Sequence, residues 1–266
     1  AGARIGAEQR LLLAGIGCGQ VDTVRRPGLA LFCTGRELVE AGAPLGSGEI
    51  RNSNGPYLSA AVAAAGAELL RYAVLPDEAA PLQRAIEDAA AAGAQVILST
   101  GAVSMGRYDF VPQVLRELDA EVVFHKLRMR PGKPLLFARL PGGQLYFGLP
   151  GNPASSAVGF RFFACAALRA LLGLRPEQPW RLPLLADARK KPGFTLYQKA
   201  RVRLGEGGRL GVELLRGQES FKVRPLAEAN AWAALPAEAE QLSAGTLIDV
   251  HGLEHWGLQL STETLA

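Results

Sequence analysis

The first two-thirds of this chain alternate short apolar runs with segments of helical periodicity, and this alternation limits the possible folds most strongly. Apolar runs bounded by turn residues are typical of strands that are buried on both faces. We expect such strands at residues 29–33, 68–75, 95–99, 121–129, 135–140 and 144–149. Helices are expected over residues 56–65, between an Asp77 cap and Gly93, and over residues 108–118 and 155–172. The pattern predicts a three-layer, doubly wound α/β domain.

The pattern changes after Gly173. Residues 175–179 carry two prolines and are typical of a linker, and the rest of the chain has short strand-like runs separated by turns. Strands at 195–204 and 209–215 flank a turn of glycines around Glu206, which predicts a hairpin, and another strand is expected at 246–250. We therefore predict a lead-in helix and linker at 1–28, an α/β domain at 29–175 and a small all-β domain at 178–266.

Composition excludes several classes of protein. The net charge of +4 is small for 266 residues, and the basic residues are scattered, so no nucleic-acid partner is expected. The three cysteines lie far apart and form no metal or disulfide pattern, which favours reduced thiols in a cytoplasmic protein. No secretory leader or membrane span is expected, because the most apolar helical segment, residues 160–174, contains Arg161 and Arg169.

Polar loops follow four of the expected strands. In open α/β sheets, ligands bind beyond the carboxyl ends of the parallel strands, so these loops should converge there. Glycines let a backbone approach a ligand closely, and carboxylates are ligands that Mg²⁺ prefers. Any one loop by itself is better explained as an ordinary turn or helix cap, but the four together favour a site. The candidates are Thr34, Gly35, Glu37, Asp77, Thr100, Gly101, Ser104, Gly106, Asp109, Pro150, Gly151, Asn152 and Pro153.

Residues 125–134 are the densest cationic segment of the chain. On a strand, Lys126, Arg128 and Arg130 would share one face, because side chains alternate with period two. A solvated strand face is the default interpretation. The more specific interpretation is a binding site for an oxyanion or phosphate, with Lys133 nearby.

Two short motifs are set aside. Residues 15–20 resemble a dinucleotide-binding loop but lack the GxGxxG spacing and a preceding strand. Residues 251–255 spell HxxEH, a zinc-peptidase pattern, but follow an expected strand and include Gly252, so they do not fit the required helix.

Several motifs together resemble the molybdopterin molybdenumtransferases, the MoeA and gephyrin E-domain family. Residues 34–38 (TGREL), followed by Pro44, Ile50 and Asn54, are similar to the family segment TGDEL…G.PL..G.I.d.N. Residues 99–106 (STGAVSMG) resemble its SSGGVSVG loop, and residues 130–134 (RPGKP) its KPGKP. Residues 148–153 reproduce GLPGNP unchanged. The resemblance extends from about residue 5 to the C-terminus.

The resemblance implies Mg²⁺-dependent insertion of molybdate into adenylylated molybdopterin, with release of AMP. It places Glu37, Asp77 and Asp109 on the family's acidic positions, with Glu37 and Asp109 as metal ligands. Lys126 and Arg130 stand where the family has two lysines. Pro150 and Pro153 stand where it has two loop prolines. Lys199 and Ser220 fall on an arginine and a serine that approach the site from the partner subunit of a homodimer. Molybdopterin adenylyltransferase and apo-molybdoenzymes are further implied partners.

The chain departs from the family pattern at several positions. Ala102 replaces a loop glycine, where a positive φ would be strained, and Arg36 replaces an aspartate beside Glu37 and adds positive charge. The resemblance includes no counterpart of the family's two N-terminal domains, so we expect either a fragment or a shortened relative. Two alternatives therefore stay open: the adenylylation of molybdopterin, since adenylyltransferases share the α/β part, and a non-catalytic pterin-binding or scaffold module.

Overall fold

The computed structural model describes residues 2–103, 110–205 and 208–260. A six-stranded sheet with the order β4-β1-β5-β9-β8-β6 forms the centre of the first domain. Its strands are β4 (Glu68–Leu75), β1 (Gly28–Thr34), β5 (Val96–Thr100), β9 (Leu145–Leu149), β8 (Leu136–Arg139) and β6 (Glu121–His125). The first four are mutually parallel, whereas β8 runs antiparallel to β9 and β6. The expected α/β fold is confirmed, with a mixed rather than an all-parallel sheet.

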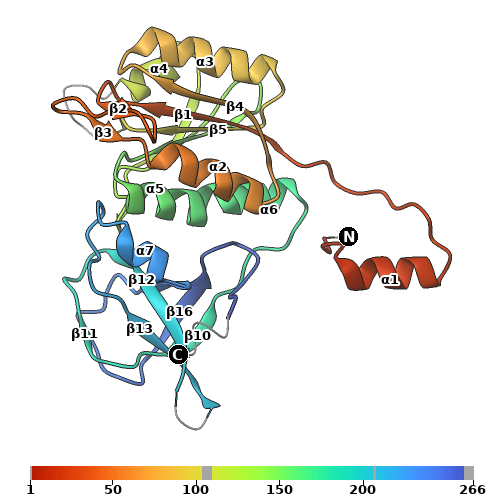
Figure 1. Cartoon of the computed structure of the whole chain (residues 1–266), viewed down its shortest axis with the longest axis vertical. Helices are drawn as coiled ribbons and strands as arrows, with labels where there is room; N and C mark the ends of the chain where they lie inside the picture. The colour runs from red at the N-terminus through yellow and green to blue at the C-terminus, as the bar shows by residue number, and fades with distance from the viewer. Residues whose placement is uncertain (1, 104–109, 206–207, 261–266) are drawn as a thin grey trace.

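Helices cover both faces of this sheet, as Figure 1 shows. On one side lie α3 (Ala79–Ala91) and α4 (Val111–Glu117); on the other lie α2 (Asn54–Ala64), α5 (Pro153–Gly159) and α6 (Cys165–Leu171). Strand β1 is buried along its whole length because it supplies both cores. Its Leu29 and Leu31 pack toward α2, and its Ala30 and Phe32 pack toward α3 and α4.

The long apolar helix expected at 155–172 runs from Pro153 to Leu171 and includes a π-helical segment at Phe160–Ala164. By length and composition alone it would be able to cross a membrane. Its position accounts for that composition, since it lies between the central sheet and the second domain (Figure 1). Arg161 within it is only 3% exposed.

The second domain is built on an antiparallel sheet with the order β10-β16-β14-β12-β13. These strands are β10 (Trp180–Pro183), β16 (Leu247–Gly252), β14 (Ala231–Leu235), β12 (Thr195–Leu204) and β13 (Leu210–Leu214). Strands β12 and β13 form the expected hairpin. The short strands β11 (Ala188–Arg189) and β15 (Gln241–Leu242) pair separately, and helix α7 is Arg224–Glu228. Trp232 of β14 packs into the core of the first domain.

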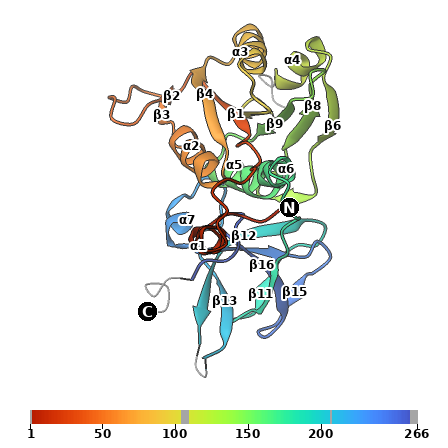
Figure 2. The ribbon, with the colours of Figure 1, turned by 90° about the vertical axis from the view of Figure 1, so that its right-hand side faces the viewer.

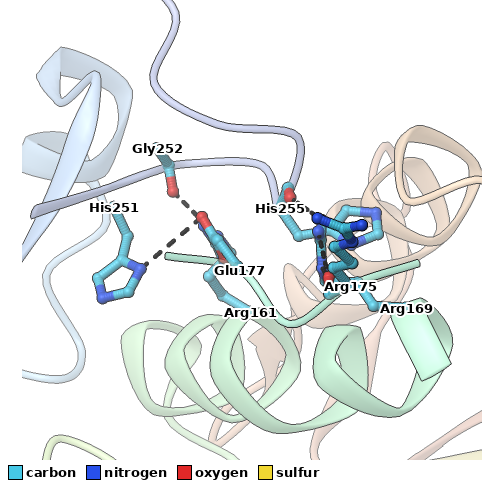
Figure 3. A network of polar contacts seen from close by, with 7 residues as sticks. All are labelled: Arg161, Arg169, Arg175, Glu177, His251, Gly252 and His255. Carbon is cyan, nitrogen blue, oxygen red and sulfur yellow. Dashed lines mark hydrogen bonds and ion pairs between the residues drawn. The ribbon is translucent and has the colours of Figure 1, made fainter. Parts of the chain in front are cut away.

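A polar network also joins the two domains (Figure 3). The guanidinium of Arg161 donates two hydrogen bonds to the Glu177 carboxylate, at 2.7 and 2.6 Å, and a third to the carbonyl of Gly252 at 2.9 Å. His251 Nδ1 lies 3.7 Å from the same carboxylate. Because burial leaves the Arg161 charge without water, these bonds supply the partners that it needs.

Helix α1 (Ala7–Gly15) stands apart from both domains at the end of an extended segment in Figure 1, and Figure 2 views it end-on in front of the body. None of its residues is buried. Cys33 and Cys165 are buried free thiols and Cys18 is a partly exposed one, so no disulfide joins these three residues. The glycine-rich segment 15–20 follows the end of a helix, which does not suit a dinucleotide loop.

The strand expected over residues 121–129 is shorter in the structure. Strand β6 ends at His125, and Lys126 has a φ of 70°, which breaks the alternation of side chains. The chain then crosses to the second domain, where β7 (Met129–Arg130) pairs with the start of β12. The prediction that Lys126, Arg128 and Arg130 share one strand face is therefore wrong.

Candidate active site

A cavity of about 880 Å³ opens beyond the carboxyl ends of the parallel strands. Strands β4, β1, β5 and β9 are neighbours in the sheet, so the loops that follow them meet at one edge. The sequence-predicted residues that line the cavity are Thr34, Glu37, Asp77, Thr100, Gly101, Pro150, Gly151, Asn152 and Pro153. The convergence of these loops, which lie far apart in the sequence, is the central geometric feature of the site.

Close backbone packing holds the loops together. The φ of Gly101 is 95°, and a Cβ on this residue would lie 2.7 Å from Thr34 Oγ1 and 2.8 Å from the Thr34 carbonyl oxygen. Thr34 Oγ1 in turn donates to the carbonyl of Thr100 at 3.1 Å. Only glycine allows this approach between the loops after β1 and β5.

The loops after β1 and β4 are joined by Asp77. Its carboxylate accepts a hydrogen bond from the backbone N–H of Arg36 at 3.2 Å. Asp77 was expected to cap α3, but the residue before that helix is Glu78, whose side chain makes no capping hydrogen bond. The guanidinium of Arg36 pairs with Glu78 at 2.7 Å, which offsets the positive charge that Arg36 places beside Glu37.

A flap, defined as residues 36–51, covers one side of the cavity. It is closed by the pairing of β2 (Leu38–Val39) with β3 (Ile50–Arg51). The flap contributes Glu37 and Arg51 to the cavity, and among the described lining residues Arg51 is the only cationic one. One nitrogen of Arg51, Nη1, donates to the carbonyls of Glu40 and Ala43.

Helix α2 begins directly after the flap. Asn52 Oδ1 accepts the N–H of Gly55 at 2.9 Å and so satisfies one N–H group in the first turn of this helix. The first residue of the helix is tied to the loop after β9, because Asn54 Nδ2 donates to the carbonyl of Gly151 at 2.7 Å. Arg51, Asn52, Ser53 and Asn54 all line the cavity but were not named as site residues from the sequence; the family-like spacing of Ile50 and Asn54 was the available signal.

The cationic candidates lie elsewhere. Neither Lys126, Arg130 nor Lys133 lines this cavity. The guanidinium of Arg130 stacks over the Phe194 ring with its Cζ 4.5 Å from the centroid, and Lys133 Nζ lies 6.0 Å from the same centroid. These two side chains therefore face the second domain, although Pro134 lines the cavity.

The second domain reaches the cavity rim through residues 217–222. The carbonyl of Ser220 accepts the N–H of Ala154 at 2.9 Å, which places Ser220 of this same chain beside the start of α5, and Phe221 lines the cavity. Lys199 is 1% exposed, and its ammonium donates to the carbonyls of Gly217, Glu219 and Lys222. Burial lowers the pKa of Lys199. Because all three N–H bonds of Lys199 are taken, it supports this rim rather than offering a donor to a ligand.

The remaining candidates are placed as follows. Gly35 lies in the loop after β1 but is not part of the lining. Ser104, Gly106 and Asp109 fall outside the described residues. His251 and His255 of the HxxEH pattern point to different partners, Glu177 and the carbonyl of Ala65, which disfavours a shared zinc ion.

The carboxylates that line the cavity fit the coordination habits of magnesium. Within the described ranges, no group of three or more His, Cys, Asp and Glu side chains gathers. Glu37 and Asp77 line one cavity, and Mg²⁺ usually binds one or two carboxylates together with waters and substrate phosphates. The cavity therefore combines carboxylates, one guanidinium and glycine-bearing turns, a set that can hold a cation and an anionic ligand side by side.

Comparisons with known proteins agree with this geometry. Residues 30–170 match the family described as a probable molybdopterin binding domain, and residues 181–253 match the MoeA C-terminal region, domain IV. A molybdopterin molybdenumtransferase from Synechococcus elongatus is 36% identical over 95% of this chain and 62% of its own length. One from Nostoc is 40% identical over 65% of this chain and 40% of its own length.

Solved structures give the same result. The crystal structure of a molybdopterin biosynthesis MoeA protein from Pyrococcus horikoshii has a TM-score of 0.78 and 27% identity, over 95% of this chain and 61% of that one. The chain thus spans about three-fifths of the length of the Synechococcus relative and of this structure.

Proposed function

This chain belongs to the family of probable molybdopterin binding domains and continues into a MoeA-type domain IV, and on that premise we propose that it inserts molybdenum into molybdopterin. The substrate we propose is adenylylated molybdopterin, which reacts with molybdate and releases AMP. The observation that carries the proposal is the single cavity in which Glu37, Asp77 and the glycine-bearing turns converge. We further propose a cytoplasmic, homodimeric enzyme.

Each part of the cavity has a task in this reaction. The turns at Gly101 and Gly151 allow the backbone to approach the pyrophosphate of the substrate. Arg51 offers charge-assisted hydrogen bonds to the same oxygens. Glu37 and Asp77 would hold Mg²⁺, which when bound neutralises the pyrophosphate and polarises the bond that breaks.

The test is AMP release from adenylylated molybdopterin in the presence of molybdate and Mg²⁺. We expect the wild-type chain to release AMP, and Glu37→Gln and Asp77→Asn to lower the rate by at least about tenfold. Glu68→Gln is the matched control, because Glu68 is an exposed carboxylate at the amino end of β4, opposite the cavity. Full-rate release by both cavity variants would contradict the proposal.

Two other functions predict different results. An adenylyltransferase would consume ATP when given molybdopterin, whereas the proposed enzyme would not. The matched domain IV disfavours this alternative, because the α/β part alone is what adenylyltransferases share. A binding module would bind the pterin in calorimetry without releasing AMP.

A further inference from the structure

Three side chains meet in a closed hydrogen-bonded triangle behind the flap. The Tyr72 hydroxyl donates to Glu40 Oε1 at 2.8 Å. Asn52 Nδ2 donates to the same Oε1 at 3.1 Å and to the Tyr72 hydroxyl oxygen at 2.8 Å. We call Glu40, Asn52 and Tyr72 the clamp. The two N–H bonds of the amide and the single O–H bond are all used within it.

The clamp joins three separate parts of the fold. Glu40 belongs to the flap, Asn52 precedes α2, and Tyr72 lies on the edge strand β4. Burial, followed by the bond to Glu40, raises the pKa of Tyr72, so the hydroxyl keeps its proton and remains a donor at neutral pH. At the start of the flap, Arg36 also bonds to Asp77 and Glu78 in the loop after β4, so the clamp adds a second attachment, to strand β4 itself.

Gly55 shows how closely the clamp is packed. A Cβ on this residue would collide with the Tyr72 hydroxyl and would lie 2.8 Å from Asn52 Nδ2. The N–H of Gly55 donates to Asn52 Oδ1, so the amide of Asn52 is bonded at both its nitrogen and its oxygen. These bonds fix the orientation of the Asn52 amide, because exchanging its oxygen and nitrogen would break them.

The clamp is connected to the cavity groups by hydrogen bonds, and its Asn52 itself lines the cavity. The carboxylate of Glu40 belongs to the clamp, while its backbone carbonyl accepts a hydrogen bond from Arg51 Nη1 at 3.2 Å. Within the flap, Ile50 N donates to the carbonyl of Glu37 at 2.8 Å, and Asn52 N donates to the carbonyl of Val39 at 2.8 Å. A shift of Glu40 would therefore move both Arg51 and Glu37.

We propose that the clamp residues are positioning residues, which hold Glu37 and Arg51 over the cavity so that the substrate's phosphate oxygens bind there. The inference rests on the proposed function, since it takes this cavity as the substrate site. Glu40 and Tyr72 do not line the cavity and act through the flap. Asn52 also lines the cavity, and the double variant below, which keeps the new carboxylate at position 52, distinguishes its action through the flap from direct repulsion of the ligand.

The decisive variant is Asn52→Asp. It places a second carboxylate about where Asn52 Nδ2 now contacts Glu40, so that two like charges repel and the triangle opens. We expect hydrogen exchange at the backbone amides of residues 50 and 52 to rise at least about tenfold. AMP affinity, measured by calorimetry with Mg²⁺, should fall at least about fivefold, and KM for adenylylated molybdopterin should rise.

The double variant Asn52→Asp with Glu40→Gln is the rescue, because it exchanges the amide and the carboxylate and restores one donor–acceptor pair. We expect exchange and AMP affinity to return to within about twofold of wild type. Tyr72→Phe removes only the hydroxyl and should give a smaller change in the same direction. Glu213→Gln is the matched control for Glu40→Gln, because Glu213 belongs to an exposed ion pair between β12 and β13. It should change neither the hydrogen exchange nor the AMP affinity.

The outcomes separate the two proposals. Unchanged exchange and affinity in Asn52→Asp, or a double variant no better than the single one, would overturn the clamp. Faster exchange with unchanged AMP affinity would also overturn it, because the flap would then not serve the site. A wild-type chain that binds AMP but releases none would refute the proposed function and leave the clamp standing. A wild-type chain that does not bind AMP would refute both.

Discussion

Ala102 has a left-handed backbone conformation, with a φ of 51°, in the loop after β5 that lines the cavity. The family pattern has glycine at this position, and the structure shows why. The loop needs a positive φ here, which costs an alanine roughly 1 kcal/mol. We expect Ala102→Gly to raise the free energy of unfolding by about 0.5–1 kcal/mol, measured by urea denaturation.

The neighbouring position provides the opposite test. Gly101→Ala should lower the free energy of unfolding by more than Ala102→Gly raises it, because the new Cβ would press on Thr34 as well as strain the backbone. If Gly101→Ala and Ala102→Gly changed the free energy of unfolding equally and in the same direction, the explanation would be contradicted.

At the level of single residues, the predicted Glu37 and Asp77 line the cavity, whereas the cationic candidates Lys126, Arg130 and Lys133 do not. Glu37 and Asp77 follow strand ends, and the position of a strand end in an α/β sheet determines where the next residue lies. Arg130 and Lys199 have long side chains, and the direction of such a side chain depends on acceptors and rings from other elements, such as Phe194 and the carbonyls of residues 217–222.

At the level of elements, a polar network connects the helix from Pro153, the linker and β16 (Figure 3). Titration of its groups makes the stability of the folded chain depend on pH. Burial by itself would raise the pKa of Glu177, but the partners His251 and Arg161 outweigh it and hold this pKa at about 2. Burial is the main cause that lowers the pKa of His255 to about 4. Both values lie below those of the unfolded chain, about 4.3 for Glu and 6.5 for His.

Stability should therefore fall in two steps as the pH is lowered. His255 is neutral in the folded chain, so its contribution is complete above pH 6.5 and is lost as pH falls toward 4. The contribution of Glu177 is complete above about pH 4.5 and is lost toward pH 2. Each step amounts to at most about 3 kcal/mol.

Urea denaturation at pH 7.5, 5 and 3 measures both steps. His255→Gln should abolish the upper step and Glu177→Gln the lower one, because neither replacement side chain titrates in this range. An upper step that persists in His255→Gln would show that another group titrates there.

At the level of the whole molecule, we expect the segment before the first domain, described from residue 2 to residue 26, to contribute little to the stability of the two domains. Helix α1 buries none of its residues, and Arg4, stacked over the Trp256 ring at 4.6 Å, makes one contact with the body. Such a contact is worth about 0.5–1 kcal/mol. We expect removal of residues 1–26 to change the calorimetric unfolding midpoint by less than about 2–3 °C.

Arg4→Ala is the companion variant, and it should reproduce most of whatever shift the deletion causes. A deletion that lowers the midpoint by much more than Arg4→Ala does would show that other residues of this segment stabilise the body.

The sequence by itself determined the order of the helices and strands and the change from an α/β to an all-β pattern. It also determined which loops carry the acidic and glycine residues. These properties are local, since a period of 2 or 3.6 residues and a turn are encoded within a few neighbours. The tertiary structure alone decided that Lys126 ends a strand, that Lys199 turns inward and that Glu40, Asn52 and Tyr72 meet behind the flap. Such contacts join residues far apart in the chain, so they form only once the packing of the two cores has placed those residues side by side.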